Sequence, residues 1–410
     1  MEARRAAELA ARNSYGRLVA YLAAKTRDVA AAEDALGDAF LSALKTWEES
    51  GVPKNPEAWL LVTARNRLID AGRRSQVRDK VLILNTFKHN GLGFSTEPSL
   101  EFVTFPDDRL KLLFICAHPA IDSAIHTALM LQTVLGLNAA QIASAFLVAP
   151  ATMSQRLVRA KTKIRDAGIA FELPEEKDLS TRLAAVLEAI YAAYTNAWET
   201  VDGRDPRHRG LAEEAIWLAR LCVQLMPQEP EARGLLALML YCESRRDARR
   251  NANGAYVPLL QQDTNLWSQT AIAEAERELT QAATFNQLGR FQLEAAIQSL
   301  HAQRAIAQPV NWQALALLYE GLIQLSPTLG ALVSHAAAIA EAQGLEYGLT
   351  RLDAIPMESI KSYQPYWALK AHLLKQSGLE AESQQAYIRA IGLTEDSTIR
   401  EFLLNKSKPK

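Results

Sequence analysis

Apolar residues recur at spacings of three and four along almost the whole chain, and the strict alternation typical of half-buried strands is nearly absent. This pattern predicts an all-α protein. Three stretches interrupt it, at residues 80–106, 168–178 and 248–264, and each contains glycine, proline or charged residues that favour turns and linkers. The third, with Gly254 and Pro258, is expected to form a loop or a short hairpin.

A helix is expected over residues 28–47, where apolar residues follow helical spacing closely. The stripe expected to face the core consists of Ala32, Ala35, Leu36, Ala39, Phe40, Ala43, Leu44 and Trp47. On the opposite side, within about 60° of one another, fall Asp34, Asp38, Leu41 and Lys45. Periodicity alone favours a solvated face with two carboxylates and one leucine.

A second helix is expected to begin with Asn55 as N-cap and Pro56 at its first position, and to continue to about Arg78. Arg67, Arg74 and Arg78 fall within about 40° on one side of it. Neighbouring guanidinium groups repel one another and stay solvated unless an anion lies alongside. They therefore indicate a track for phosphate groups, with a solvated helix end as the alternative.

The sharpest local signal lies in residues 138–166, which read as a short helix, a tight turn and a basic helix. Asn138 and Gln141 form a capping-box pattern at the first helix, and Pro150 stands at the first position of the second. This order predicts a helix-turn-helix. The inward side of the second helix is expected to hold Met153, Leu157, Ala160 and Ile164.

The adjacent side of that basic helix mixes hydrogen-bonding and cationic side chains, as contacts with DNA bases and phosphates require. Its members are Thr152, Gln155, Arg156, Arg159 and Lys163. An ordinary surface helix with basic residues near its C-terminus is the alternative interpretation, since such residues also suit the helix dipole.

Composition describes an ordinary globular chain of two or three domains: 410 residues, 49% hydrophobic, 22% charged, with a net charge of -1. The charge is unevenly distributed. Residues 1–170 carry 22 Lys and Arg against 17 Asp and Glu, whereas residues 171–410 carry 23 against 29. The front of the chain is therefore basic and the back acidic.

Three cysteines, Cys116, Cys222 and Cys242, argue for a reducing compartment rather than a disulfide framework. The start of the chain lacks the apolar core of a signal peptide, and no apolar run has the length of a membrane span. These features predict a cytoplasmic protein with no membrane partner.

The sequence has no recognisable pattern of catalytic residues. No glycine-rich phosphate loop follows a strand, and no serine or cysteine has the neighbourhood of a nucleophile. Cys116 and His118 are two metal-type ligands without a second pair nearby, and a turn is the favoured role for His118 before Pro119. We therefore expect no enzyme activity, no metal and no cofactor.

Together the basic segments resemble the RNA polymerase sigma factors of the extracytoplasmic-function group of the sigma-70 family. Residues 32–41 resemble the polymerase-docking helix, residues 59–74 the helix that meets the −10 promoter element, and residues 139–165 the domain that reads the −35 element. Gly37 stands where this family usually has glutamine, and glycine costs a helix up to about 1 kcal/mol.

A subfamily with a long helical C-terminal extension is the most similar part of that family. The resemblance rests on residues 105–120, then on residues 235–240, Arg249 and Arg250, and on Gln262, Asp263 and Trp267. It implies four parts: sigma region 2 in residues 1–80, a linker in residues 81–106, sigma region 4 in residues 107–170, and the extension in residues 175–410.

The resemblance also implies partners and contacts. Asp34, Asp38 and Leu41 are expected to bind core RNA polymerase. The residues expected to contact promoter DNA are Lys54, Arg65, Arg67, Arg74 and Arg78 in the first part, and Thr152, Gln155, Arg156, Arg159 and Lys163 in the helix-turn-helix.

The extension shows one tetratricopeptide-like spacing, formed by Trp367, Ala371, Leu374, Gly378, Ser383, Tyr387 and Ala390. An array of such repeats would leave a concave surface for an anti-sigma factor or other regulatory protein, whereas a compact domain would only stabilise its neighbours. Two other classes of function remain open. One is a stand-alone helix-turn-helix regulator with a helical sensing domain, and the other is a scaffold whose basic stretches are incidental.

Overall fold

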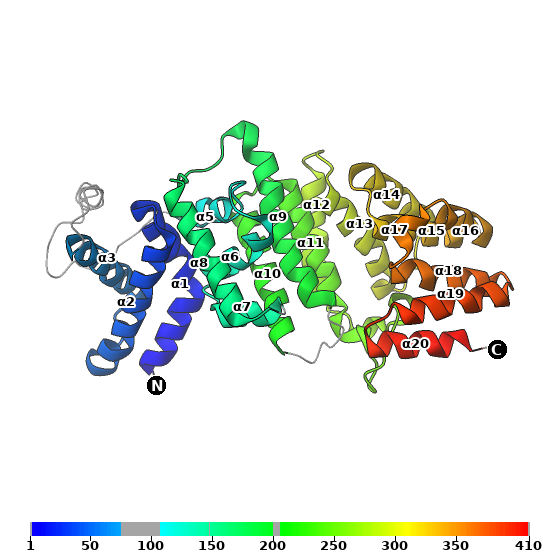
Figure 1. Ribbon diagram of the computed structural model, residues 1–410, viewed down its shortest axis with the longest axis horizontal. Helices are drawn as coiled ribbons and strands as arrows, with labels where there is room; N and C mark the ends of the chain where they lie inside the picture. Colours follow the sequence, from blue (N-terminus) through cyan, green and yellow to red (C-terminus); the bar gives the residue numbers. More distant parts are fainter. Residues whose placement is uncertain (1, 75–106, 147, 200–205, 409–410) are drawn as a thin grey trace. The chain divides into compact units, whose positions relative to one another are not determined.

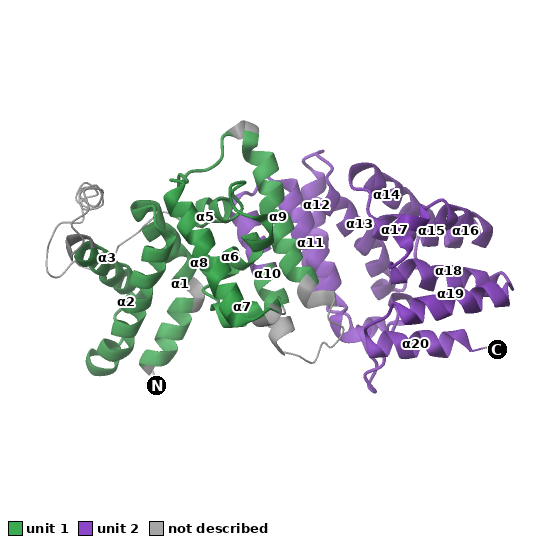
Figure 2. Cartoon of the chain, viewed as in Figure 1, with its two compact units in different colours: residues 1–215 green, residues 216–410 purple. Residues whose placement is uncertain are grey.

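The computed structural model describes residues 2–74, 107–146, 148–199 and 206–408. As the apolar spacing predicts, these residues are helical (Figure 1). Strand-like pairing within them is limited to one antiparallel bridge between Arg250 and Tyr256. The chain divides into two units, residues 1–215 and residues 216–410 (Figure 2). The expected linker at residues 81–106 lies outside the described residues.

The first unit begins with three mutually packed helices, α1 (Glu2–Thr26), α2 (Val29–Ser50) and α3 (Pro56–Arg74). Side chains cap the second and third. The amide of Ala31 donates to Asp28 Oδ1 at 3.0 Å, and the amide of Ala58 donates to Asn55 Oδ1 at 3.0 Å. The N-cap role predicted for Asn55 is thereby confirmed.

In its described residues the first unit also contains α5 (Arg109–Cys116), α6 (Ser123–Thr133), α7 (Ala139–Ala145), α8 (Pro150–Asp166), α9 (Glu176–Glu199) and the first half of α10 (Pro206–Leu225). Helix α9 packs on α5 and α6. Thr127 Oγ1 donates to the Ala189 carbonyl at 2.8 Å, and Arg182 donates to the Phe114 carbonyl at 2.5 Å. The first helix of the acidic half therefore belongs to the unit that holds the basic segments.

Helix α1 approaches the end of α6 closely. A Cβ atom at Gly16 would overlap the carbonyl oxygen of Val134, and the Tyr15 ring lies against Gly136, whose φ is +72°. Only glycine fits without displacement at these two positions. The three N-terminal helices and the helices around α8 are thus in direct contact.

The second unit is a succession of helices in which neighbours along the chain pack together. It begins within α10 (Pro206–Leu225) and continues with α11 (Pro230–Ser244), α12 (Gln269–Ala283), α13 (Arg290–Ala302), α14 (Trp312–Leu325), α15 (Leu329–Gln343), α16 (Leu345–Asp353), α17 (Met357–Ile360), α18 (Gln364–Gln376), α19 (Glu380–Gly392) and α20 (Ser397–Ser407). Four short 3₁₀ segments interrupt it, η2 (Arg246–Arg249), η3 (Leu259–Gln261), η4 (Thr264–Leu266) and η5 (Gln303–Ile306).

Helix α11 is the centre of the first part of this unit, because most of its residues are buried. The Glu231 carboxylate accepts from the backbone amides of Phe291 and Gln292 at 2.9 and 3.1 Å, and so caps α13 from another helix. A Cβ atom at Gly234 would lie 2.7 Å from the Gln292 nitrogen, so glycine permits this close helix approach.

Helices α18 and α19 form the hairpin expected from the tetratricopeptide-like spacing. Ala371, Leu374, Tyr387 and Ala390 are buried together, and Ser383 Oγ donates to the Ala371 carbonyl at 2.9 Å. The turn between the helices uses Gly378 at φ +76°. The classification of this hairpin as a tetratricopeptide repeat stays a prediction.

Residues 248–264 form a loop with a single bridge, as expected of this stretch. The amide of Gly254, whose φ is +80°, donates to the Asn251 carbonyl at 2.9 Å and closes the turn. In the part of the chain that the structure describes, no helix combines the length and apolar character needed to cross a membrane.

Candidate nucleic-acid interface

The exposed face of α2 carries the side chains expected at a protein interface. Asp34, Asp38 and Leu41 are all exposed, Leu41 to 62% of its surface. The opposite stripe is buried at Ala32, Ala35, Leu36, Ala39, Ala43 and Trp47. The face that α2 turns outward therefore has two carboxylates against the one ammonium group of Lys45, and an apolar centre, a composition suited to a basic and apolar partner.

Leu44 corrects the predicted core stripe. It is 38% exposed, and Phe40 is only half-buried. Leu44 lies three residues after Leu41, so the two side chains are neighbours on one side of the helix. The apolar part of the face is consequently larger than the sequence predicted.

The cations expected along α3 occupy different environments. Arg67 is exposed, and its Nη2 donates to Ser42 Oγ on α2 at 3.3 Å. Arg65 is half-buried. Burial of the Tyr21 phenol raises its pKa, and the nearby charge of Arg65 opposes that shift. Lys54 is exposed in the loop before α3. Arg74 is the last residue of α3, whereas Arg78 lies outside the described residues.

Helix α8 has the two sides that its sequence predicts. Met153, Leu157, Ala160 and Ile164 are its buried residues. The five residues proposed for DNA contact are all exposed: Thr152, Gln155, Arg156, Arg159 and Lys163. The capping box before α7 is also confirmed, since Asn138 N donates to Gln141 Oε1 and Gln141 N donates to Asn138 Oδ1, both at 2.9 Å.

Three of these cations line a groove between α8 and the start of α6. Its volume is about 420 Å³, and its lining residues are Ile121, Asp122, Ala124, Ile125, Arg156, Arg159, Ala160 and Lys163. One Asp122 oxygen caps α6 by accepting from the Ala124 amide at 3.0 Å. Three cations against one carboxylate leave the groove positive, which suits a phosphate group.

A buried ion pair connects α8 to α2. Lys161 Nζ lies 2.6 Å from Glu33 Oε2, and the two side chains are only 11% and 10% exposed. Burial raises the pKa of the Glu33 carboxyl, while the Lys161 ammonium opposes that shift. The sequence analysis missed both residues, because Lys161 falls between the inward and the basic side of its helix.

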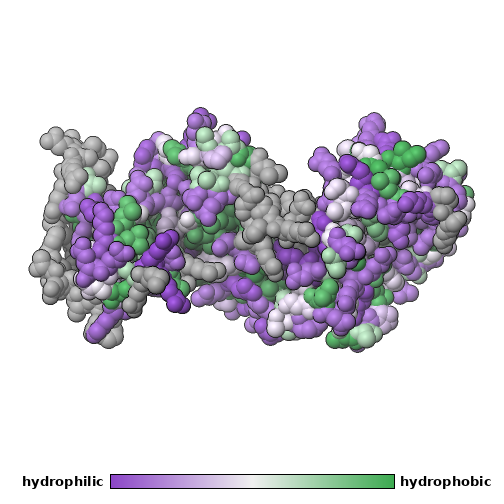
Figure 3. Space-filling view, turned by 90° about the horizontal axis from the view of Figure 1, so that it is seen from below, coloured by the Kyte–Doolittle hydropathy of each residue, from purple (hydrophilic) through white to green (hydrophobic). Residues whose placement is uncertain are grey.

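Helix α2 therefore contacts both α3 and α8. Helices α3 and α8 thus pack on the same helix. Among the coloured residues, the face drawn in Figure 3 is mostly hydrophilic, with apolar side chains in separate groups.

Cys116 and His118 are engaged within the protein. The Cys116 sulfur lies 3.3 Å from Thr133 Oγ1, and burial raises the pKa of this thiol to about 12. His118 Nδ1 accepts from the Ala120 amide at 3.1 Å, which is the turn role expected of it. Among the described residues, no group of three or more potential metal ligands gathers.

Comparison with known proteins supports the N-terminal assignment. Residues 11–78 match sigma-70 region 2, and residues 182–283 match a family of unknown function, DUF6596. An uncharacterized protein of Rhizobium meliloti (strain 1021) is 37% identical to this chain over 381 residues, which are 92% of this chain and 89% of that relative. No solved structure matches the chain. The chain therefore belongs to the same family as this relative, and through its region 2 it is a sigma-70 family sigma factor of transcription initiation.

Proposed function

We propose that the protein is an extracytoplasmic-function sigma factor that binds core RNA polymerase and recognises two promoter elements. The observation that carries this proposal is the two-sided helix α8. Its four apolar residues are buried and its five polar and cationic residues are exposed, in a chain that also matches sigma-70 region 2. Catalysis belongs to the polymerase, so the chain itself needs no catalytic residue and no cofactor.

Polymerase binding is assigned to the exposed face of α2. Leu41 and Leu44 supply the apolar centre, and Asp34 and Asp38 supply charges that steer encounter with a basic surface. Gly37 lies in the middle of this face and has open space around it.

Recognition of the −10 element is assigned to α3 and the loop before it. Opening the duplex costs stacking and pairing energy, which bases held in protein pockets can offset. Arg67 and Lys54 are exposed and would contact phosphates. Arg65, Arg74 and Arg78 complete the proposed set, although Arg65 is half-buried and contributes less surface to DNA.

Recognition of the −35 element is assigned to α7 and α8 as a helix-turn-helix. Thr152, Gln155 and Arg156 lie on the first two turns of α8, the part that such motifs insert into the major groove. Arg159 and Lys163 lie further along the helix and face the groove beside α6, where they would bind the phosphate backbone.

The closed packing of the first unit bears on how it meets DNA. Elements centred about 10 and 35 base pairs before the start site lie about 85 Å apart on straight B-DNA. Helices α3 and α8 both pack on α2, which has 22 residues and is about 33 Å long, so their packed positions span less than the distance between the two elements. Binding a promoter therefore requires α8 to leave α2 and the Glu33–Lys161 pair to break.

The extension is proposed to regulate the separation of α8 from α2. We keep the division of the chain into region 2, linker, region 4 and extension that the sequence indicated, and propose that residues 175–410 contact a regulatory protein such as an anti-sigma factor. Since α9, the first helix of the extension, is packed on α5 and α6, a protein bound to α9 has a direct route to the DNA-binding helices.

Transcription with purified components tests the proposal. Core polymerase should initiate at specific promoters only when this protein is added, and sequencing of the transcripts would reveal both elements. Mobility shifts with and without core enzyme separate the rival function, because a stand-alone regulator would bind its site without polymerase. Promoter-independent transcription, or an equal shift without polymerase, would contradict the proposal.

A further inference from the structure

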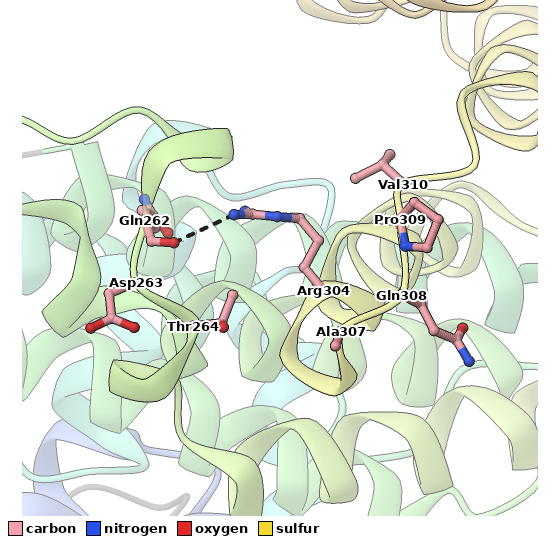
Figure 4. A pocket seen from close by; sticks show the side chains of 8 residues that line it. All are labelled: Gln262, Asp263, Thr264, Arg304, Ala307, Gln308, Pro309 and Val310. Atoms are coloured by element: carbon pink, nitrogen blue, oxygen red, sulfur yellow. Dashed lines mark hydrogen bonds between the residues drawn. The ribbon is translucent and has the colours of Figure 1, made fainter.

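The second unit contains a cavity that the proposed function does not use. Its volume is about 480 Å³, and it is open to solvent. Three segments line it, with the residues Gln262, Asp263, Thr264, Arg304, Ala307, Gln308, Pro309 and Val310 (Figure 4). Gln262–Thr264 falls in the stretch that matches the family of unknown function.

Hydrogen bonds to backbone carbonyls hold the Arg304 side chain of this cavity in place. Arg304 donates to the carbonyls of Leu259, Leu260 and Gln262 at 2.7, 3.0 and 3.4 Å, and its guanidinium lies 5.5 Å from the centre of the Trp267 ring. These contacts use three of the five guanidinium N–H groups and fix the side chain without neutralising its charge. In the described part of the chain Arg304 makes no ion pair, so its charge remains available to an anionic group.

The opposite charge is also present in the cavity and is also unpaired. Asp263 is exposed, and one of its oxygens accepts from the Asn265 amide at 2.9 Å. No ion pair joins Asp263 to Arg304 among the described residues, although both line the same space. The cavity thus offers one fixed cation and one carboxylate.

Gln262 forms part of the wall behind this arrangement. Its side chain is 5% exposed, and its Nε2 donates to the Val257 carbonyl at 3.2 Å. The Oε1 atom is buried and has no hydrogen-bond partner.

We propose that this cavity binds a zwitterionic α-amino acid or a short peptide with free ends and an apolar side chain. The ligand carboxylate lies at Arg304, and the ammonium group binds Asp263. The apolar side chain packs against Pro309 and Val310. A phosphate dianion fits less well because Asp263 repels it, and a metal ion would find only one carboxylate among the lining residues.

Calorimetric titration of the full-length protein with L-leucine and L-leucyl-L-leucine tests the site, and the two probes distinguish a free amino acid from a peptide. At least one probe should bind saturably. For the probe that binds, its N-acetylated form, which lacks the ammonium group, and its amidated form, which lacks the carboxylate, should each bind at least tenfold more weakly.

Asp263→Asn is the matching variant, because asparagine retains the helix-capping acceptor and removes only the charge. This variant should bind the zwitterionic probe at least tenfold more weakly than the wild type does. N-acetylation of the probe should then reduce its affinity for the variant no further. Asp396→Asn is the control, since Asp396 caps α20 and does not line this cavity. Absence of binding by both probes at millimolar concentration, or equal binding by the two variants, overturns the proposal. Neither result depends on promoter recognition.

Discussion

Two sets of cations, one in each unit, are used in opposite ways. On α8 the side chains of Arg156, Arg159 and Lys163 are exposed and, among the described residues, make no ion pair. In the second unit Arg233 is 7% exposed and is bound to Glu278 and to the Pro227 carbonyl. Positive charge therefore indicates a binding surface only where the fold leaves it unpaired.

The largest expected effect follows from removing an internal cation. Arg233→Met leaves Glu278 without its partner in a mostly buried setting, which should cost about 3–5 kcal/mol of unfolding free energy. Arg156→Ala should change that free energy by less than about 0.5 kcal/mol. Chemical denaturation of both variants measures the contrast. Equal losses of unfolding free energy in the two variants would show that these two sets of cations do not differ in this way.

Acid should weaken the second unit through His301. Burial and two nearby arginines, Arg245 and Arg304, lower the pKa of this histidine from 6.5 to about 4. The folded state holds the neutral ring, so stability is complete above pH 6.5 and falls as the pH drops toward 4, by at most about 3 kcal/mol. Melting curves of the wild type and His301→Gln check this, and the variant should show a shallower decline.

Removing cations from α8 should weaken promoter binding without unfolding the protein. Arg156→Ala and Arg159→Ala should each cost the polymerase complex about 1–3 kcal/mol of binding to its promoter. Arg165→Ala is the control, because Arg165 is on the same helix but pairs with Asp166. Promoter affinity measured for the three variants decides the matter, and wild-type affinity in the first two would favour the scaffold interpretation.

Charge reversal at the contact between α2 and α8 should open the first unit. Lys161→Glu places a second carboxylate beside Glu33. The interaction energy between positions 33 and 161 is expected to be about 0.5–3 kcal/mol. The variant should expand in solution scattering and bind core polymerase more tightly. Combining it with Glu33→Lys should restore the closed state, and a compact Lys161→Glu protein would argue against the closed contact.

The smallest effect is expected at Gly37. An added methyl group meets nothing within 4 Å, so Gly37→Ala should stabilise α2 by up to about 1 kcal/mol through helix propensity. Thermal unfolding measures this gain. A loss of stability would mean that the glycine has a structural role at this position.

Features that depend on local spacing were predictable from the sequence. The capping box at Asn138 and the buried side of α8 are set by residues within a few positions of each other, and the structure has both. Such features need only the helical period and local hydrogen bonding.

Features that depend on distant contacts were not predictable in the same way. The exposure of Leu44 is set by where neighbouring helices end, and the Glu33–Lys161 pair joins residues 128 positions apart. The packing of α9 on α5 and α6 likewise gives no periodic signal in the sequence. The candidate DNA-contact residues of α8 were recognisable, whereas the contact that restrains that helix was not.

The central claim is that the α2 face binds core polymerase. Gel filtration of the protein with core RNA polymerase from the organism that encodes it tests this most directly, with the variant Asp34→Ala, Asp38→Ala, Leu41→Ala beside the wild type. The account predicts that the wild type co-elutes with the polymerase and that the triple variant, folded as judged by circular dichroism, elutes alone. A wild-type protein that elutes alone at every salt concentration would contradict it.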